Sequence, residues 1–327
     1  MNNKTDCIVE VKNLRKYFPV SDGIMNTEML KAVDGVSLSI KAGETLGLVG
    51  ESGSGKSTLG RTLLNLYKPT SGEILYKGRS VKSKKDIYNF RRNTAMIFQD
   101  PYSSLDPRMT VADIIGEPLD IHKCYKNKAD RMGKILNLMS LVGLNSEHAA
   151  RYAHEFSGGQ RQRIGIARSL ALKPEFIVCD EPVSALDVSI QAQIINTLEQ
   201  LQHKLGLSYL FIAHDLLVVR HISDRIAVMY LGRIVELSDT EELFYNPMHP
   251  YTQALLSAIP LPDPEAAKRA ERLILSGDIP SPLNAPSGCA FRTRCRYAKE
   301  ECAAFVPELA EIKKGHFVAC HRVSEIN

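Results

Sequence analysis

The stretch GESGSGKST at residues 50–58 carries the residue types of a phosphate-binding loop. It fits the pattern of a glycine, four residues and then Gly-Lys-Ser. Glycines at 53 and 55 let backbone N–H groups wrap a phosphate, Lys56 can reach the β and γ phosphates, and Ser57 offers a hydroxyl to Mg²⁺. The competing interpretation is a flexible Gly/Ser loop, which needs neither a strand before it nor a helix after it. The pattern predicts nucleotide binding.

Two adjacent carboxylates end the apolar run FIVCDE at residues 176–181. Asp180 is placed to hold Mg²⁺ or its water, and Glu181 is placed to polarise an attacking water. A solvated helix cap is the other interpretation of such a pair. Next to a phosphate-binding loop, the pair is a candidate for hydrolytic chemistry.

Three more segments carry polar residues at the ends of expected elements. In EFSGGQRQRIGIARSL, the small residues from Ser157 to Gly159 precede an amphipathic helix, whose free N–H groups form a second candidate anion site. Gln99 in MIFQD and His214 in FIAHD each follow a strand. Singly, a surface glutamine and a core histidine are the commoner interpretations. Their order along one chain favours a shared function.

The elements around these residues alternate between strand and helix. ETLGLVG before the phosphate loop and SYLFIAHD near residue 210 are short apolar runs typical of buried strands. KSTLGRTLLNL and IQAQIINTLEQLQHKLG have apolar residues at helical spacing. This alternation predicts a parallel α/β architecture.

The flanking regions predict different structures. CIVEVKNLRKYF and AVDGVSLSI alternate as half-buried strands do, residues 110–155 have a helical pattern, and RIAVMYLGRIVEL is expected to be a hairpin that turns at residues 231–233. Beyond about residue 245 the chain becomes rich in proline. We therefore place a domain boundary near residue 240.

Composition excludes several classes of protein. The net charge of +4, from 41 basic and 37 acidic residues, is too balanced for an electrostatic nucleic-acid binder, so we expect no nucleic-acid partner. The chain has no apolar run long enough for a signal peptide or a membrane span. We expect it to stay in the cytosol, where thiols remain reduced.

Together these motifs resemble the ATP-binding subunits of ATP-binding cassette (ABC) transporters. The resemblance covers about residues 7–240 and rests on the identity, order and spacing of the Walker A loop, the Q-loop at Gln99, the signature FSGGQ, Walker B, the D-loop SALD and the switch residue His214. It departs at Phe156, where the family more often has leucine. The implied fold class is an α/β P-loop NTPase cassette with an antiparallel β subdomain and a helical subdomain, plus a small C-terminal extension.

The resemblance implies a role for each matching residue. Glu181 and His214 would be catalytic, Gln99 would sense the γ-phosphate, and Phe18, or else its neighbour Tyr17, would stack on adenine. Mg²⁺ would be held by Ser57, Gln99 and Asp180. The nucleotide-binding positions are Phe18, Gly50, Ser52, Gly53, Ser54, Gly55, Lys56, Ser57, Thr58, Gln99, Asp180, Ser157, Gly158, Gly159, Gln160 and Asp187.

In this family two cassettes meet head to tail, and each ATP lies between the Walker A loop of one and the signature of the other. One Walker A loop and one signature occur here, so a second cassette would complete each site. Asp187 would couple the two sites. The domains implied are a cassette at residues 1–240, with its helical subdomain at about 100–160, and an extension at 241–327.

The resemblance is sharper to the peptide importers, and in particular to the F-type ATP-binding subunits of oligopeptide and dipeptide permeases. NPMHPYTQALLSAIP and the cysteine-bearing tail match that group's extension. This implies a D-type cassette partner, two transmembrane permease subunits, an extracytoplasmic solute-binding protein and a place on the cytoplasmic face of the membrane. Importers of nickel or glutathione, a non-transport ABC ATPase and a cassette that binds ATP without hydrolysing it are the alternatives.

Four cysteines gather in the tail, at Cys289, Cys295, Cys302 and Cys320. Four thiolates can hold either a tetrahedral Zn²⁺ or a [4Fe–4S] cluster, and the wide spacing lacks the close pairs that structural zinc sites favour. The resemblance to the peptide-importer extension also implies an iron–sulfur cluster. Zinc and unliganded buried cysteines are the alternatives. The other three cysteines, within the cassette, are expected to be ordinary thiols.

Overall fold

The structure, a computed structural model, describes residues 7–22, 26–260, 273, 275 and 277–326. Within the chain there are two compact units. One is formed mainly by Tyr76–Ile212 and the other by Glu10–Ser39, Thr45–Leu75 and Ala213–Asn327. The division does not fall at residue 240, and the boundary there stays a prediction based on composition.

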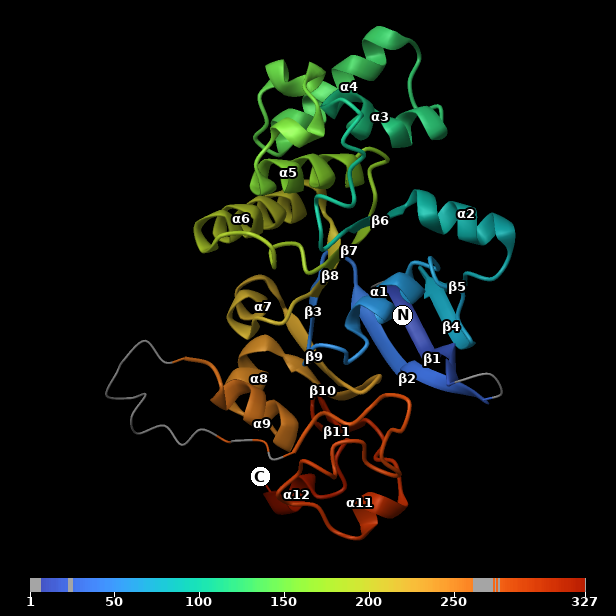
Figure 1. Cartoon of the computed structure of the whole chain (residues 1–327), viewed down its shortest axis with the longest axis vertical. Coiled ribbons are helices and arrows are strands. Elements are labelled where there is room, and N and C mark those ends of the chain that lie inside the picture. Colours follow the sequence, from blue (N-terminus) through green and yellow to red (C-terminus); the bar gives the residue numbers. More distant parts are fainter. Residues whose placement is uncertain (1–6, 23–25, 261–272, 274, 276, 327) are drawn as a thin grey trace, which may run out of the picture. The chain divides into compact units, whose positions relative to one another are not determined.

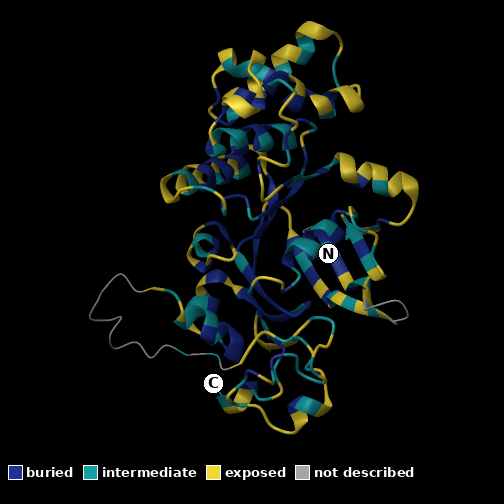
Figure 2. Cartoon of the chain, viewed as in Figure 1, coloured by how far each residue is buried: buried dark blue, intermediate teal, exposed yellow. Residues whose placement is uncertain are grey.

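The first unit is built on three parallel strands. They are β6 (Thr94–Ile97), β7 (Phe176–Asp180) and β8 (Ser208–Ile212), in the spatial order β8-β7-β6. Every residue of β7 and β8 is buried, as expected for parallel strands that are covered on both faces (Figure 2). The predicted parallel α/β architecture is confirmed.

The helices of the first unit begin at polar residues, and in all of them except the last the side chain of that residue accepts a backbone N–H group. They are α2 (Lys84–Arg92), α3 (Val111–Ile121), α4 (Lys128–Leu141), α5 (Gly158–Ser169) and α6 (Val188–Leu205), with short turns η1 (Ser146–Ala150) and η2 (Ala153–Glu155). Thr110 accepts from the Asp113 N–H at the start of α3, and Asn127 accepts from the Asp130 N–H at the start of α4. Helix α3 packs against α4 and α5 (Figure 1). Residues 110–155 are therefore mostly helical, as the pattern predicted.

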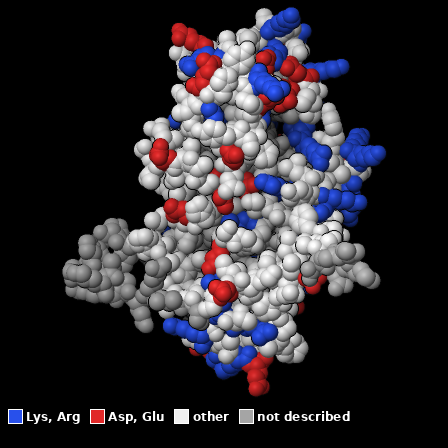
Figure 3. Space-filling model, in the orientation of Figure 1, with Lys and Arg blue, Asp and Glu red and all other residues white. Residues whose placement is uncertain are grey.

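Helix α2 carries a local concentration of positive charge. Its sequence, KKDIYNFRR, has two lysines and two arginines against one aspartate. Blue side chains gather at the right of Figure 3, where α2 lies in Figure 1. The near-neutral whole chain thus contains a basic surface on one helix.

The second unit contains most of β1 (Cys7–Asp22) and β2 (Asn26–Lys41), with β4 (Ser71–Tyr76), in the order β2-β1-β4. It also contains β3 (Thr45–Val49), which is fully buried and pairs in parallel with β9 (Arg225–Tyr230). Between these elements the strand β3 leads into helix α1 (Lys56–Leu63), the strand, loop and helix unit that the sequence predicted.

The predicted hairpin is confirmed as β9 and β10 (Arg233–Asp239), which pair antiparallel around Leu231 and Gly232. Two strands from the proline-rich tail, β12 (His316–Val318) and β11 (Ala310–Lys313), continue this sheet in the order β11-β12-β10-β9-β3. The tail therefore extends the sheet of the second unit.

Short helices complete the second unit. They are α7 (Leu216–Ile222), α8 (Thr240–Tyr245), α9 (Pro250–Ser257), α11 (Glu301–Ala304) and α12 (Val323–Ile326). The fully buried carboxylate of Glu236 on β10 accepts the backbone N–H groups of Met248 and His249 at 2.7 and 3.1 Å. It also lies 2.8 Å from Nε2 of the buried His316 on β12. A buried carboxylate needs such partners, and these partners tie the tail to the sheet.

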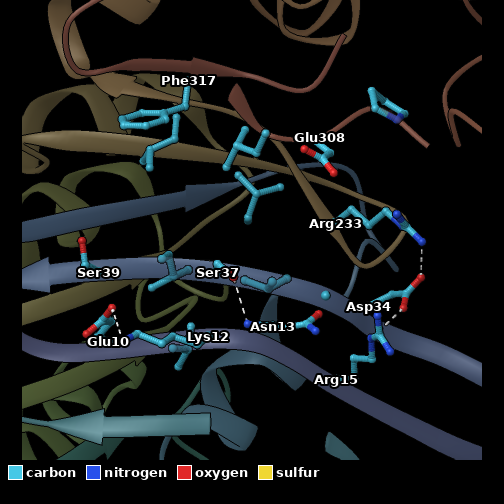
Figure 4. A pocket seen from close by; sticks show the side chains of 18 of the residues that line it. Glu10, Lys12, Asn13, Arg15, Asp34, Ser37, Ser39, Arg233, Glu308 and Phe317 are labelled. Atoms are coloured by element: carbon cyan, nitrogen blue, oxygen red, sulfur yellow. Dashed lines mark hydrogen bonds and ion pairs between the residues drawn. The ribbon is translucent and has the colours of Figure 1, made fainter. Parts of the chain in front are cut away.

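A groove of about 720 Å³ lies within the second unit, between β1, β2, the β9-β10 hairpin and residues 306–309. Figure 4 shows Asp34 in the groove between Arg15 and Arg233, with the Arg233 guanidinium 2.6 Å from the Asp34 carboxylate. The charges that line the groove have both signs, since Lys12 and Glu308 also face it. The charges that line this groove therefore favour neither an anionic nor a cationic ligand.

Candidate active site

The phosphate loop joins β3 to α1 and closes around a lysine. Lys56 is buried, and its ammonium donates to the carbonyl oxygens of Gly50 at 2.8 Å and Glu51 at 3.0 Å. Gly55 caps α1 in the left-handed region with φ 102°, and a Cβ at this position would lie 2.1 Å from the Ala32 carbonyl oxygen. Only glycine fits this turn without strain. The loop has the curvature that N–H groups need to surround a phosphate.

The other predicted loop residues lie in the second unit with Lys56. Gly53 has φ 76°, and Ser54 is buried. Ser57 and Thr58 occupy the first turn of α1, where the positive end of the helix dipole lies. This helix start is suited to an anion.

The carboxylate pair lies at the carboxyl end of β7 in the first unit. Asp180 is fully buried as the last residue of the strand, and Glu181 follows with φ 46°. A left-handed backbone is uncommon for a residue other than glycine and often marks a functional site. The side-chain amide of Gln99, just beyond β6, donates to the Glu181 carboxylate at 2.7 Å. The fold thus brings together the predicted phosphate sensor and the predicted base.

The signature residues begin helix α5. Ser157 is its N-cap, and Ser157 and Gln160 form a reciprocal capping box. Gly158 and Gly159 provide the first helical turn, and Ile190 of α6 fills the space next to Gly159. A helix start made of small residues is suited to an anion, and the second anion site stays a prediction.

Asp187, the predicted coupling residue, is the N-cap residue of α6 and lies in the first unit with the signature. The D-loop before it is held by the Ser184 and Leu186 N–H groups, which donate to the Glu181 and Val183 carbonyl oxygens. The D-loop therefore continues directly from the predicted base.

His214 and Phe18 lie in the second unit. His214 is exposed between β8 and α7. Phe18 is half-buried; its ring contacts the edge of the Tyr67 ring at a centroid distance of 5.5 Å, and the Lys16 ammonium lies 4.6 Å from its centroid. The Tyr17 phenol instead donates to Asp34, and burial with this carboxylate raises the pKa of Tyr17 to about 12. Tyr17 is therefore engaged elsewhere, which leaves Phe18 as the better candidate to stack on a base.

The four tail cysteines line one small cavity, together with His249, Phe291 and Tyr297 among others. The Cys289 N–H donates to the Cys302 carbonyl oxygen at 2.8 Å. Burial, with a contribution from the neighbouring thiols, raises the pKa of Cys289 to about 11 and also raises the pKa values of Cys295 and Cys320. A bound cation would favour the thiolates.

The cysteine cavity can be compared with the metal centres that the sequence predicts there. Among the residues that the structure describes, no three His, Cys, Asp or Glu side chains form a site for a metal ion. The four thiols nevertheless supply the donor set that an iron–sulfur cluster takes. Cys179 is buried, whereas Cys7 and Cys124 are partly exposed, so these three are separate from the tail cavity.

Sequence reasoning missed three residues around the phosphate loop. Glu51 within the loop donates its N–H to the Tyr251 hydroxyl at 2.8 Å, and its carboxylate accepts from Arg294. Arg294 lies between Cys289 and Cys295, but a single arginine carries no signal for a partner 243 residues earlier.

Two family models match the chain. The model described as "ABC transporter" matches residues 33–184, and the model described as "Oligopeptide/dipeptide transporter, C-terminal region" matches residues 235–302. The second match contains three of the four tail cysteines, Cys289, Cys295 and Cys302.

The chain is similar over nearly its full length to named proteins. It is 55% identical to the putative oligopeptide transport ATP-binding protein YkfD of Bacillus subtilis (strain 168), over 96% of this chain and 95% of that protein. It is 54% identical to the oligopeptide transport ATP-binding protein AppF of the same strain, over 98% of both chains.

Solved structures agree with the fold. A dimeric post-hydrolysis structure of the ATP-binding cassette MJ0796 with ADP and Pi matches with a TM-score of 0.64 and 29% identity, over 71% of this chain and 99% of that one. CbiO1 from Clostridium perfringens, part of the ABC transporter complex CbiONQ, matches with a TM-score of 0.63 and 27% identity, over 74% and 92%. In the part of this chain that the structure describes, no helix is both long and apolar enough to cross a bilayer.

Proposed function

This chain belongs to the ATP-binding subunits of ABC transporters, in the group with the oligopeptide/dipeptide C-terminal region, and we propose on that basis that it hydrolyses ATP to power the import of peptides. The similarity to two oligopeptide transport ATP-binding proteins over almost the whole chain carries this proposal. It covers the cassette and the tail alike.

The chain's own residues supply most of the chemistry. The phosphate loop and Lys56 bind the β and γ phosphates through N–H groups and a positive charge. Glu181 accepts a proton from the attacking water, Gln99 holds the Glu181 carboxylate in place, and His214 positions the water and the γ-phosphate. This division of roles rests on the motifs and on the Gln99–Glu181 hydrogen bond.

Mg²⁺ fits the donor set that the motifs offer. A hydroxyl from Ser57, a carboxylate from Asp180 and an amide oxygen from Gln99 are the hard oxygen ligands that this ion takes. When bound with ATP, the ion neutralises charge that develops on the phosphates.

A second cassette would complete each ATP site by presenting its signature to the Walker A loop of this chain. We infer that the partner is a D-type cassette, so that two related but distinct chains form the pair. Ser157 and the first turn of α5 in this chain would then contact the ATP of the partner, with Asp187 between the two sites.

The remaining subunits are two transmembrane permeases and an extracytoplasmic solute-binding protein. The cassette would lie on the cytoplasmic face of the membrane, held there by the permeases. Tyr102, which is 58% exposed after the Q-loop, stacks on the Arg161 guanidinium at 4.0 Å. Such a fixed exposed aromatic is suited to receive a helix from a permease subunit.

The tail cysteines are the proposed ligands of a [4Fe–4S] cluster, held by Cys289, Cys295, Cys302 and Cys320. Its role would be structural, because this segment has little core of its own and a metal centre can hold such a segment together. Anaerobically purified protein should be brown, with broad absorbance near ~400 nm and about four irons per chain. Colourless protein with one zinc per chain would show that the four cysteines bind Zn²⁺. Metal-free protein with an ordered tail would show that the four thiols bind no metal.

Affinity purification from membranes tests the assembly. The tagged chain should bring down a second cassette, two multi-span membrane proteins and a peptide-binding lipoprotein. A solute-binding partner that prefers nickel or glutathione would change the cargo. Recovery with soluble proteins alone would favour a non-transport ATPase.

A further inference from the structure

Glu51 is held at its backbone and at its side chain. It is the second residue of the phosphate loop, and its carbonyl oxygen accepts from the Lys56 ammonium at 3.0 Å and from the Ser54 N–H at 3.2 Å. Its N–H donates to the Tyr251 hydroxyl at 2.8 Å. The position of Glu51 therefore bears directly on the position of Lys56.

The carboxylate of Glu51 is held by the tail. The Arg294 guanidinium donates two hydrogen bonds to it, at 2.7 and 3.1 Å, one to each oxygen. This is the paired geometry in which arginine binds a carboxylate most strongly. The Arg294 side chain is 7% exposed and that of Glu51 is 21% exposed, so solvent screens the pair only in part.

Arg294 is joined to a packed aromatic cluster through its backbone, since its N–H donates to the Phe291 carbonyl oxygen at 3.0 Å. Phe291, in the same segment, lies between Tyr230 of β9 and Tyr251 of α9, with ring centroids 5.3 and 5.4 Å away. All three rings are buried. The segment also lies between Cys289 and Cys295, so the cluster of cysteines and the phosphate loop are joined through a few residues.

Charge gives this contact a consequence for nucleotide binding. The phosphates of ATP are strongly anionic, and an unpaired carboxylate in the loop that binds them would repel them. The two hydrogen bonds from Arg294 neutralise that carboxylate and turn it toward the tail. An Arg294 side chain cut short would leave a partly buried charge without its partner.

We propose that Arg294 is a positioning residue for the phosphate loop, and that through Glu51 the cysteine-bearing tail sets the affinity of the cassette for ATP. The proposal rests on the proposed function only in taking ATP as the ligand of this loop. It predicts that nucleotide affinity depends on the charge of Glu51 when Arg294 is removed.

The test compares the assembled wild-type complex with Arg294→Ala, Arg294→Lys and the double variant Arg294→Ala/Glu51→Gln. Arg294→Ala should raise the KM for ATP about tenfold, which corresponds to about 1.4 kcal/mol, with kcat within about twofold. Arg294→Lys keeps the charge but loses the paired geometry, so its KM should rise about threefold. The double variant should return KM to within about threefold of the wild type, because the repelling charge is gone.

The matched control is Arg296→Ala. Arg296 is exposed, lies on the other side of Cys295 from Arg294, and donates a hydrogen bond from its guanidinium to the Tyr297 hydroxyl. The KM of this variant should not change. If the role of Arg294 were purely structural, the single and the double variant would be impaired to the same extent in kcat and in KM. Glu51→Gln would then give no rescue, and this result would overturn the proposal. An unchanged KM in Arg294→Ala would do the same.

The KM values of the variants and the activity of the wild-type complex separate the possible outcomes. If Arg294→Ala does not fold, Arg294→Lys and the double variant still decide by their KM values. If the wild-type complex itself neither binds nor hydrolyses ATP, the proposed function fails, whereas a wild type that works and variants that show no rescue reject this inference alone.

Discussion

Glu181 combines a left-handed backbone with a hydrogen bond from Gln99, and this pairing places the proposed sensor of the γ-phosphate against the proposed base. Lys56 has a different task, since its ammonium lies inside the loop that takes the phosphates. Substitution of a residue that binds phosphate and substitution of a residue that accepts a proton should therefore change different kinetic parameters.

Lys56→Ala should weaken ATP binding, because it removes a charge-assisted contact to phosphate. Glu181→Gln should bind ATP, remain dimeric with its partner cassette and lower kcat by at least about a hundredfold, the usual contribution of a general base. Nucleotide binding and steady-state hydrolysis in the assembled complex measure both effects. Near-normal turnover by Glu181→Gln would remove the assignment of the base.

Most of these residues could be found in the sequence because each belongs to a local pattern at the end of an expected strand or helix. Glu51, Tyr251 and Arg294 could not be. Their contacts join positions about 200 and 243 residues apart, and a pair so distant leaves no periodicity or spacing to read.

The signature helix depends on close packing against its neighbour. A Cβ on Gly159 would lie 2.5 Å from Cγ2 of Ile190, and a β-branched side chain has little freedom to move away. Gly159→Ala should therefore lower the free energy of unfolding by about 1–3 kcal/mol. Urea denaturation of the purified chain measures the change.

Gly165 in the same helix is the matched control. A Cβ there meets no atom within 4 Å. Gly165→Ala should stabilise the chain by up to about 1 kcal/mol through helix propensity alone. Equal effects at the two positions would show that packing on Ile190 does not decide the cost.

At the scale of elements, the sequence predicted the strands and helices near the motifs, since hydrophobic period marks them directly. It did not predict that the tail extends the sheet. β12 has three residues, and its pairing with β10 depends on the buried Glu236 and His316, which are 80 residues apart. Short strands with distant partners are set by tertiary contacts.

For the whole molecule, the exposed surface after the Q-loop should contact a permease subunit. A cysteine that replaces Tyr102 should form crosslinks to a multi-span membrane protein in native membranes, whereas Leu105, which is 3% exposed, is too buried to be labelled. Mass spectrometry of the crosslinked product identifies the partner. Crosslinks to soluble proteins alone would argue against the transporter assembly.

We propose that ATP hydrolysis by this chain drives peptide import. The direct measurement is uptake of an isotopically labelled mixture of short peptides into proteoliposomes that contain the complete complex and its solute-binding protein, with ATP on the cassette side. We predict uptake that requires ATP and falls to background with Glu181→Gln. Hydrolysis of ATP by the wild type without peptide accumulation, or uptake that is undiminished by Glu181→Gln, would show that ATP hydrolysis by this chain does not drive peptide import.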